Sequence, residues 1–248
     1  MNIKRIAALL LASTMLCGAL ASCKDNKAKT SKNNADNTER NYTADGELPT
    51  AADLAGVELE EAVVAQSRDA YLSIIDEDWK SQYSGGDDEN NPLTYDAGIV
   101  HIDKNGDYTV SVNADTKGFR YRSTGDPDKE YKPKGLSFAA VVINDAEKVL
   151  PDAVITIKSV KVDGNEVELK KKSYTNTESG SVRSNIFNSW ISDDSLPSDA
   201  RTAEGALFNG SAPSDINDGS YSAQLIDKDA FKEWTKVEVE FTVSGLAS

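Results

Sequence analysis

The sequence predicts an all-β fold: two sheets packed as a jelly-roll-like sandwich, with one or two short helices. Residues Val154–Leu169 form two alternating runs around Asp163-Gly164, and Asp-Gly in this position is a strong signal for a hairpin turn. Residues Lys236–Ser244 place an apolar side chain at every second position, the period of a strand with one buried face. Residues Leu136–Ile143 form a continuous apolar run, typical of a strand in the middle of a sheet. About eight strands with hairpins and long connections favour a two-sheet sandwich.

Residues 1–22 have the pattern of a secretory signal peptide, with Lys4 and Arg5 before an apolar run that ends in small residues. The tetrapeptide at residues 20–23, LASC, resembles the lipobox of bacterial lipoproteins, whose cysteine is acylated and becomes the first residue of the processed chain. The only other cysteine, Cys17, lies inside the signal, so the processed chain would form no internal disulfide. We therefore expect lipidation of Cys23 and anchoring at the extracellular face of the cell membrane. The alternative is a secreted protein that is cut nearby.

Composition divides the rest of the chain into a tether and one domain. Residues 23–50 are rich in Asn, Lys, Thr and Asp with almost nothing to bury, and are predicted to be a disordered tether. Residues 51–248 are predicted to form the β-sandwich domain, in which residues 53–66 fit either a short helix or an opening strand. The formal charge of −14 disfavours nucleic acid and anionic lipid surfaces as partners, because both require a basic patch.

Turn-forming residues divide the domain into its remaining elements. Gly85-Gly86 and the acidic run after them predict a loop, and Asn105-Gly106 predicts a hairpin turn. Residues 117–135 and 191–218 are polar and predict long connections. The further predicted strands are Ala70–Ile75, Ala97–Ile102, Tyr108–Ala114, Arg183–Trp190 and Tyr221–Ile226.

Residues 227–234 predict one or two helical turns before the last strand. Asp227 is the expected N-cap, because a carboxylate there accepts hydrogen bonds from the first backbone N–H groups. Phe231 and Trp234 then lie on one face. We expect Trp234 to be part of the core.

No catalytic residue is predicted. His101 is the only histidine and lies inside a predicted strand, and without a Gly-x-Ser-x-Gly turn neither a Ser-His-Asp nor a histidine-rich zinc site is indicated. Residues 103–107, DKNGD, begin like a calcium loop, but the sixth position is Tyr108 and the twelfth is Ala114, which favours a hairpin turn. Calcium stays open as a ligand of acidic clusters such as residues 76–78, and no other cofactor is expected.

Aromatic side chains beside Asn and Arg suggest a sugar-binding surface. Sugar rings present apolar C–H faces that pack on flat aromatic rings, while polar side chains form hydrogen bonds with the hydroxyl groups. Trp79 and Tyr83 lie close together in the sequence beside the Gly-rich loop. Trp190 follows Arg183 and Asn188 in a predicted strand. We expect the three aromatic side chains to stack on sugar and the two polar ones to form hydrogen bonds; for each tryptophan the alternative is a place in the core or at a sheet edge.

Five segments carry a resemblance to a known module: AYLSIIDEDWKSQY, GDYTVSV, ITIKSVKVDGNEVEL, RSNIFNSW and AFKEWTKVEVEFTVSG. In this order they resemble a β-sandwich module of extracellular clostridial proteins, often appended to cellulases and treated as carbohydrate-binding-like. The resemblance covers most of residues 70–245 and implies that Trp79 and Tyr83 match the Trp-x-x-x-Tyr pattern after its first strand. It also implies that Arg183, Asn188 and Trp190 match one of its later strands. The chain departs from the appended form because it carries no catalytic domain.

Together these features predict a non-catalytic cell-surface lipoprotein whose β-sandwich binds a polysaccharide or oligosaccharide. The alternative is a structural or protein-interaction module of the cell envelope, with its aromatic side chains buried. A glycosidase is a third and disfavoured hypothesis. Its chemistry needs two carboxylates roughly 5–10 Å apart, but no acidic residue stands out by its context.

Overall fold

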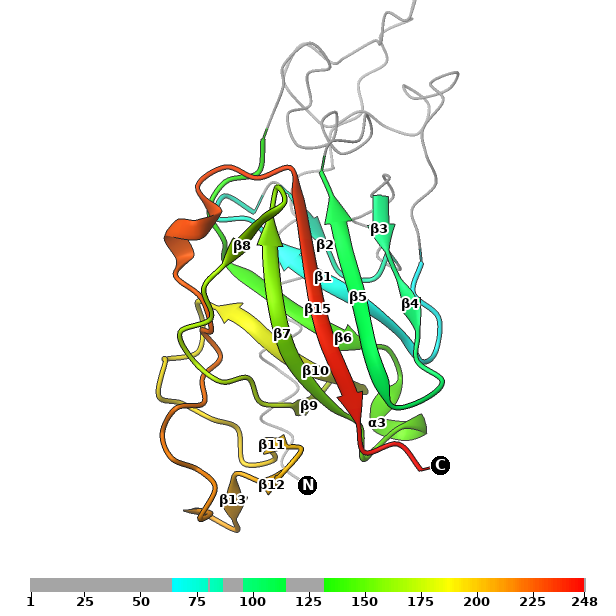
Figure 1. The fold of residues 1–248 in the computed structure, drawn as a ribbon, viewed down its shortest axis with the longest axis vertical. Coiled ribbons are helices and arrows are strands. Elements are labelled where there is room, and N and C mark those ends of the chain that lie inside the picture. The colour runs from blue at the N-terminus through cyan, green and yellow to red at the C-terminus, as the bar shows by residue number, and fades with distance from the viewer. Residues whose placement is uncertain (1–63, 80, 87–95, 115–131, 248) are drawn as a thin grey trace, which may run out of the picture. The chain divides into compact units, whose positions relative to one another are not determined.

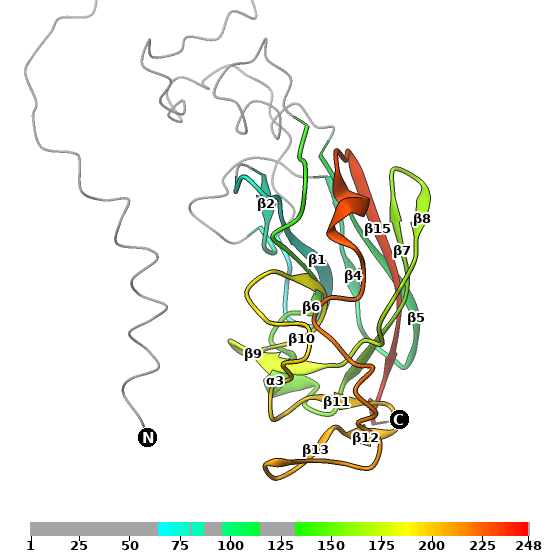
Figure 2. The same cartoon turned by 90° about the vertical axis from the view of Figure 1, so that its left-hand side faces the viewer.

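Two antiparallel sheets form two layers, which Figures 1 and 2 show from two sides. The structure is a computed structural model and describes residues 64–79, 81–86, 96–114 and 132–247. The first sheet contains, in spatial order, β2 (Gln82–Tyr83), β1 (Asp69–Ile75), β6 (Phe138–Ile143), β10 (Ser181–Asn188) and β9 (Asn176–Glu178), with β4 (Val100–His101) paired to β1. The second sheet contains β3 (Asp96–Gly98), β5 (Gly106–Asn113), β15 (Lys236–Ser244), β7 (Val154–Val162) and β8 (Asn165–Val167). The predicted all-β sandwich is confirmed.

Several predictions lie outside the described residues. They concern the signal peptide, Cys23, the tether, residues 53–63 and most of the two polar loops around residues 87–91 and 117–131. Within the described part of the chain, no helix is long and apolar enough to cross a membrane.

The core lies between the facing sides of the two sheets. Strand β15 runs through the centre of the second sheet, and its Val239 lies between Val110 of β5 and Val160 of β7. Strand β6 holds the corresponding central place in the first sheet, as its continuous apolar run predicts. Burying each large apolar side chain stabilises the fold by about 1.5–3 kcal/mol. The inward side chains of these strands and of β1 are buried: Leu72, Ile74, Val141, Ile143, Val237, Val239, Phe241 and Val243.

The side of the first sheet that faces away from the second sheet is called the outer face below. Strand register places its members on β1, β6 and β10, where side chains alternate between the two sides. A β-bulge between Asn185 and Phe187 shifts this alternation, so that Phe187 turns inward and Asn188 lies opposite Phe138. The bulge therefore adds Asn188 to the outer face, whose residues are Tyr71, Ser73, Ile75, Phe138, Ala140, Val142, Arg183, Asn185 and Asn188.

Two local predictions are confirmed by the backbone. Asp163 and Gly164 have φ angles of +49° and +81°, and Val162 pairs with Asn165, so the turn between β7 and β8 has two residues with positive φ. The 3₁₀ helix η2 (Lys228–Phe231) follows Asp227, whose side chain accepts a hydrogen bond of 3.0 Å from the backbone N–H of Asp229.

Other elements differ from the prediction. The segment expected as one strand at Ala97–Ile102 is divided between the sheets, because β3 pairs with β5 whereas β4 pairs with β1. The Asn105-Gly106 turn therefore does not join two paired strands. Residues Tyr221–Ile226 are buried as their apolar composition predicts, but the only ladder contact among them is an isolated bridge from Tyr221 to Lys172. The polar strand β9 and the short helix α3 (Ala146–Val149) were not expected.

Residues 191–218, predicted as a long connection, contain two small hairpins. These are β11 (Arg201–Thr202) with β12 (Gly205–Ala206), and β13 (Phe208–Asn209) with β14 (Ala212–Pro213). They pack around a small apolar cluster separate from the main core, formed by Tyr174, Ala200, Leu207, Tyr221 and Ala223. Residues 191–218 contribute Ala200 and Leu207 to this cluster and share it with Tyr174, Tyr221 and Ala223 from outside the segment, which anchors the polar segment to the domain.

Candidate functional site

Two exposed tryptophans meet at the end of the first sheet. Trp79 lies in the turn after β1, and Trp190 lies two residues beyond the end of β10. Their ring centroids are 5.3 Å apart and their planes are tilted by 51°. The exposed fractions are 56% for Trp79 and 54% for Trp190, whereas most tryptophans in folded proteins are largely buried. The two side chains form a paired aromatic surface that the solvent can reach.

Trp190 is held in place from two sides. Its ring stacks on Phe138 of the outer face, with centroids 5.7 Å apart and planes within 20° of each other. Its backbone N–H donates a hydrogen bond of 3.0 Å to the side-chain oxygen of Asn188. The Gln224 amide donates to the carbonyl oxygens of Asn188 and Ile191, at 3.3 and 2.8 Å, and so ties together the backbone on both sides of Trp190. The ring that is offered to solvent is therefore preorganised.

Trp79 has a strained backbone. Its φ angle is +58°, in the left-handed region that residues with a side chain rarely adopt. Hydrogen bonds from Trp79 N–H to the Asp76 carbonyl oxygen, at 3.2 Å, and from Ser81 N–H to the Asp76 carboxylate, at 3.0 Å, hold the turn in this shape. Backbone strain that persists at an exposed aromatic residue is typical of functional positions.

Arg183 and Asn188 lie beside the tryptophan pair but serve mainly as supports. The Arg183 guanidinium lies 5.7 Å from the ring centroid of Phe138 and forms an ion pair of 3.0 Å with Glu178. Its side chain is only 16% exposed. Asn188 is buried and uses its side-chain oxygen on Trp190. The structure thus brings Trp79, Trp190, Arg183 and Asn188 together, with the two polar residues behind the aromatic surface.

Tyr83 does not belong to this surface. It pairs with Ile74, is fully buried, and meets the Tyr71 ring edge to face with centroids 6.0 Å apart. Burial, and then the nearby Tyr71 and Asp69, raise the pKa of the Tyr83 hydroxyl above its usual range. The expected platform of Trp79 and Tyr83 is therefore corrected: the partner of Trp79 is Trp190. Phe138 was missed, because within an apolar strand nothing marks one residue as the support of a surface ring.

A groove of about 470 Å³ is lined by sequence neighbours of both tryptophans but by neither tryptophan itself, and it includes Phe187, whose side chain turns inward from the outer face. Its walls include Glu77, close to Trp79 in the sequence, and Ser137 and Ser189, which precede Phe138 and Trp190. The Ser189 N–H donates a hydrogen bond of 3.0 Å to the Ser137 carbonyl oxygen, which joins these two walls. The charged side chains that line the groove are Glu77, Lys134, Lys228, Asp229 and Lys232.

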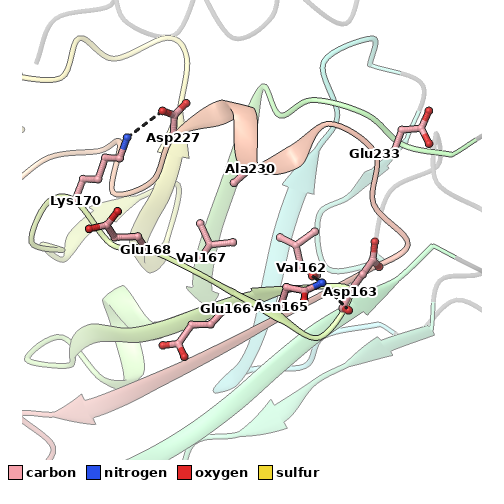
Figure 3. A pocket seen from close by; sticks show the side chains of 10 residues that line it. All are labelled: Val162, Asp163, Asn165, Glu166, Val167, Glu168, Lys170, Asp227, Ala230 and Glu233. Carbon is pink, nitrogen blue, oxygen red and sulfur yellow. Dashed lines mark hydrogen bonds and ion pairs between the residues drawn. The ribbon is translucent and has the colours of Figure 1, made fainter.

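A second groove, of about 530 Å³, lies between the β7–β8 hairpin and η2 (Figure 3). Its lining is acidic, with Lys170 as the one cation among the lining residues, paired with Asp227 at 3.0 Å. The Asp163 carboxylate accepts hydrogen bonds from the backbone N–H groups of Thr235 and Lys236, at 2.9 and 2.7 Å, so its role is structural. In the described residues no group of three or more His, Cys, Asp or Glu side chains is placed to hold a metal ion. Five carboxylates line this groove: Asp163, Glu166, Glu168, Asp227 and Glu233.

The histidine and the calcium-like sequence have structural partners. His101 is 58% exposed and its Nδ1 lies 2.8 Å from the Asp69 carboxylate, but no nucleophile is found beside the pair among the described contacts. Asp107 forms an ion pair of 3.2 Å with Lys158 and accepts a hydrogen bond from the Thr242 hydroxyl. These bonds hold the pKa of the Asp107 carboxyl below its usual range, the Thr242 bond contributing most. Asp107 thus joins β5 to β7 and β15.

The chain was compared with family models, with curated proteins and with solved structures, and none of them matches it. The feature of the described residues that points to a function is therefore the exposed tryptophan pair at the end of the outer face.

Proposed function

We propose that the domain binds a glycan through Trp79 and Trp190 and does not cleave it. The observation that carries the proposal is the pairing of two half-exposed tryptophans, one of them fixed by stacking on Phe138 and by its bond to Asn188. Such rings pack against the C–H faces of sugars, and a fixed ring loses little conformational freedom when a ligand binds.

The tryptophan pair is unusual in composition for a protein surface. In the described part of the chain the large apolar residues that are exposed are Val64, Trp79, Val149 and Trp190, and the two tryptophans are in contact with each other. Scattered exposed apolar residues need no explanation, whereas a contiguous aromatic patch marks an interaction site. Groups that can form hydrogen bonds with hydroxyls line the groove that contains Ser137 and Ser189, which matches the mixture of ring faces and hydroxyls in a sugar.

The tilt of the rings favours an isolated glycan chain over a crystalline surface. Two rings inclined by 51° cannot both lie flat against one plane, but they can contact two sides or two successive units of a single twisted chain. The ligand that fits is therefore a soluble or exposed polysaccharide chain.

We further propose that the protein displays this site on the cell surface from a lipid anchor on Cys23, as the LASC tetrapeptide suggests.

Affinity electrophoresis of the protein in gels that contain single plant and host polysaccharides tests the proposal. We expect retardation by one class of glycan, and its loss in Trp79→Ala and Trp190→Ala. Val149→Ala is the matched control, because Val149 is also exposed and apolar but lies on α3, away from the tryptophan pair. If no polysaccharide retards the wild type, or if both tryptophan variants bind as well as it does, glycan binding is refuted and the surface is assigned to a protein partner.

A further inference from the structure

The groove lined by Ser137 and Ser189, which precede Phe138 and Trp190 in the sequence, differs in charge from the groove of Figure 3. The chain as a whole has a formal charge of −14, and the groove of Figure 3 is lined by five carboxylates and one lysine. The groove that contains the two serines is lined instead by three lysines and two carboxylates. Because Lys134 pairs with Asp78, the other two lysines are matched in number by Glu77 and Asp229, so this groove is balanced in charge where the groove of Figure 3 is acidic.

Two of these lysines are available to a ligand. In the described residues Lys228 and Lys232 are exposed and form no ion pair, whereas Lys134 lies 3.8 Å from the Asp78 carboxylate. An ammonium group with no protein partner can form charge-assisted hydrogen bonds with an anionic ligand.

The lysines are carried by a fixed part of the backbone. Lys228 lies in η2 and Lys232 follows it, and the end of η2 is bound to the wall that contains Gly135. The Gly135 N–H donates hydrogen bonds to the carbonyl oxygens of Phe231 and Lys232, and the Trp234 indole N–H donates to the Gly135 carbonyl oxygen at 3.2 Å. A side chain at residue 135 would collide with Glu77, and the φ angle there is +62°, so only glycine permits this approach.

We infer that this groove receives an acidic sugar of the glycan that the tryptophans bind, with Lys228 and Lys232 contacting its carboxylate. The inference rests on the proposed function, because it assigns a charged unit to the same ligand. The sugar rings would stack on Trp79 and Trp190, while the carboxylate of a uronic acid further along the chain enters the groove lined by Ser137 and Ser189.

The net charge also limits how many acidic sugars the ligand carries. Glu77 and Asp229 line the same groove, and the rest of the domain is acidic, so a polymer charged at every unit is repelled outside the site. The ligand that fits has a mostly neutral backbone with isolated uronic acids.

The experiment is a binding array of glycan pairs in which a uronic acid is replaced by its parent neutral hexose, probed with the wild type and three variants. We expect a preference of about tenfold for the acidic member of a pair, the size of one charge-assisted hydrogen bond. Lys228→Gln/Lys232→Gln should lose the preference and keep the affinity for the neutral member. Lys104→Gln/Lys148→Gln, which changes two exposed lysines outside the groove, should keep both. The preference should also shrink as salt is added.

The outcomes separate the two proposals. Equal binding of both members by the wild type, or a preference that survives Lys228→Gln/Lys232→Gln, overturns the acidic sugar while glycan binding stands. Trp79→Ala/Trp190→Ala should abolish binding of both members. If it does not, or if the wild type binds neither set, glycan binding by the tryptophan pair fails, and the acidic sugar fails with it.

Discussion

The side-chain oxygen of Asn188 accepts a hydrogen bond of 3.0 Å from the backbone N–H of Trp190, two residues further along the chain. This bond begins the turn that carries Trp190 from the end of β10 to the outer face. The β-bulge before it is what places Asn188 where the bond can form.

Replacing Asn188 should loosen Trp190 without removing any aromatic group. Asn188→Ala should lower the free energy of unfolding by about 1 kcal/mol and weaken glycan binding, because Trp190 must then be ordered when the ligand binds. Urea denaturation and affinity electrophoresis measure the two effects. Asn188→Ser keeps a short acceptor suited to such turns and should restore part of the affinity. Unchanged affinity in Asn188→Ala would show that the bond has no positioning role.

The left-handed backbone at Trp79 predicts that two variants that both lose binding will differ in stability. Alanine at this position keeps the unfavourable φ of +58°, whereas glycine adopts it freely. Trp79→Gly should therefore be more stable in urea than Trp79→Ala by about 1 kcal/mol, although neither variant binds glycan. An alanine variant as stable as the glycine variant would mean that the turn relaxes and that Trp79 is not held under strain.

Alanine substitutions at Gly180 and Gly245 distinguish the cost of backbone strain from the cost of a steric collision. Their φ angles are +86° and +84°, but a side chain at residue 180 meets nothing within 4 Å, whereas one at residue 245 collides with the carbonyl oxygen of Asp152. Gly180→Ala should cost about 1 kcal/mol of unfolding free energy, from strain alone. Gly245→Ala should cost about 1–3 kcal/mol more, because backbone must move.

The residues after Gly245 make this comparison informative. Asn105 forms hydrogen bonds of 2.9 and 3.1 Å with the backbone N–H and carbonyl oxygen of Leu246, which fix the end of the segment. Equal costs in the two glycine variants would contradict the structure, because they would show that the segment detaches instead of resisting the collision.

The buried tyrosines should make the domain sensitive to alkali. Burial raises the pKa of Tyr71 to about 12, from about 10 in an unfolded chain. A raised pKa in the folded state means that this contribution to stability is complete below pH 10 and is lost as the pH rises toward 12. Urea denaturation should show a steep loss of stability over this range in the wild type and a shallower loss in Tyr71→Phe. Equal slopes would indicate that Tyr71 ionises as freely in the folded state as in the unfolded one.

Tryptophan fluorescence tests the placement of the three indoles. Trp234 is buried and bonded to Gly135, while Trp79 and Trp190 are half exposed. Trp79→Phe/Trp190→Phe should leave emission that acrylamide quenches weakly, and Trp234→Phe should leave emission that it quenches strongly. Weak quenching in both variants would place the tryptophan pair in the interior and support a structural role for it.

The strands that sequence reasoning found are those whose burial follows one simple pattern. The observed bounds of β15 are those expected, because one of its faces is buried along its whole length. The hairpin at Asp163-Gly164 was equally clear, since its turn chemistry is local. Strand β9 was missed because its pairing with β10 is driven by position and not by apolar side chains.

Whereas β9 is a strand that was not predicted, residues Tyr221–Ile226 were predicted as a strand and do not form one. Their apolar side chains are buried, as expected, but two clusters share them: Tyr221 and Ala223 belong to the smaller one, while Leu225 and Ile226 belong to the main core. Backbone bonds join Ser222 to Lys172 and Leu225 to Ile186, but between them the Gln224 backbone N–H donates to the Ser222 hydroxyl at 2.9 Å, which interrupts any ladder. An apolar composition predicts that side chains are buried, but it does not predict which backbone N–H and C=O groups are free to pair with another strand.

The sequence indicated that exposed tryptophans form the site, but it did not indicate which aromatic residue contacts Trp79. Closeness in the sequence suggested Tyr83 as the partner of Trp79, but the strained turn sends Tyr83 into β2 and the core. The true partner, Trp190, comes from a strand that lies on the other side of β6. Only the strand order of the first sheet brings the two tryptophans together, and a single sequence does not encode that order in any local pattern.

The central position of β15 sets the order in which the domain can be completed. Strands β5 and β7 are neighbours only through β15, which pairs with both along its length. Until residues 236–244 have been synthesised, the second sheet consists of two separate halves, each with an open edge, and the core has no central layer on that side. A chain that lacks residues 236–244 would therefore have no continuous second sheet and should not reach the folded state.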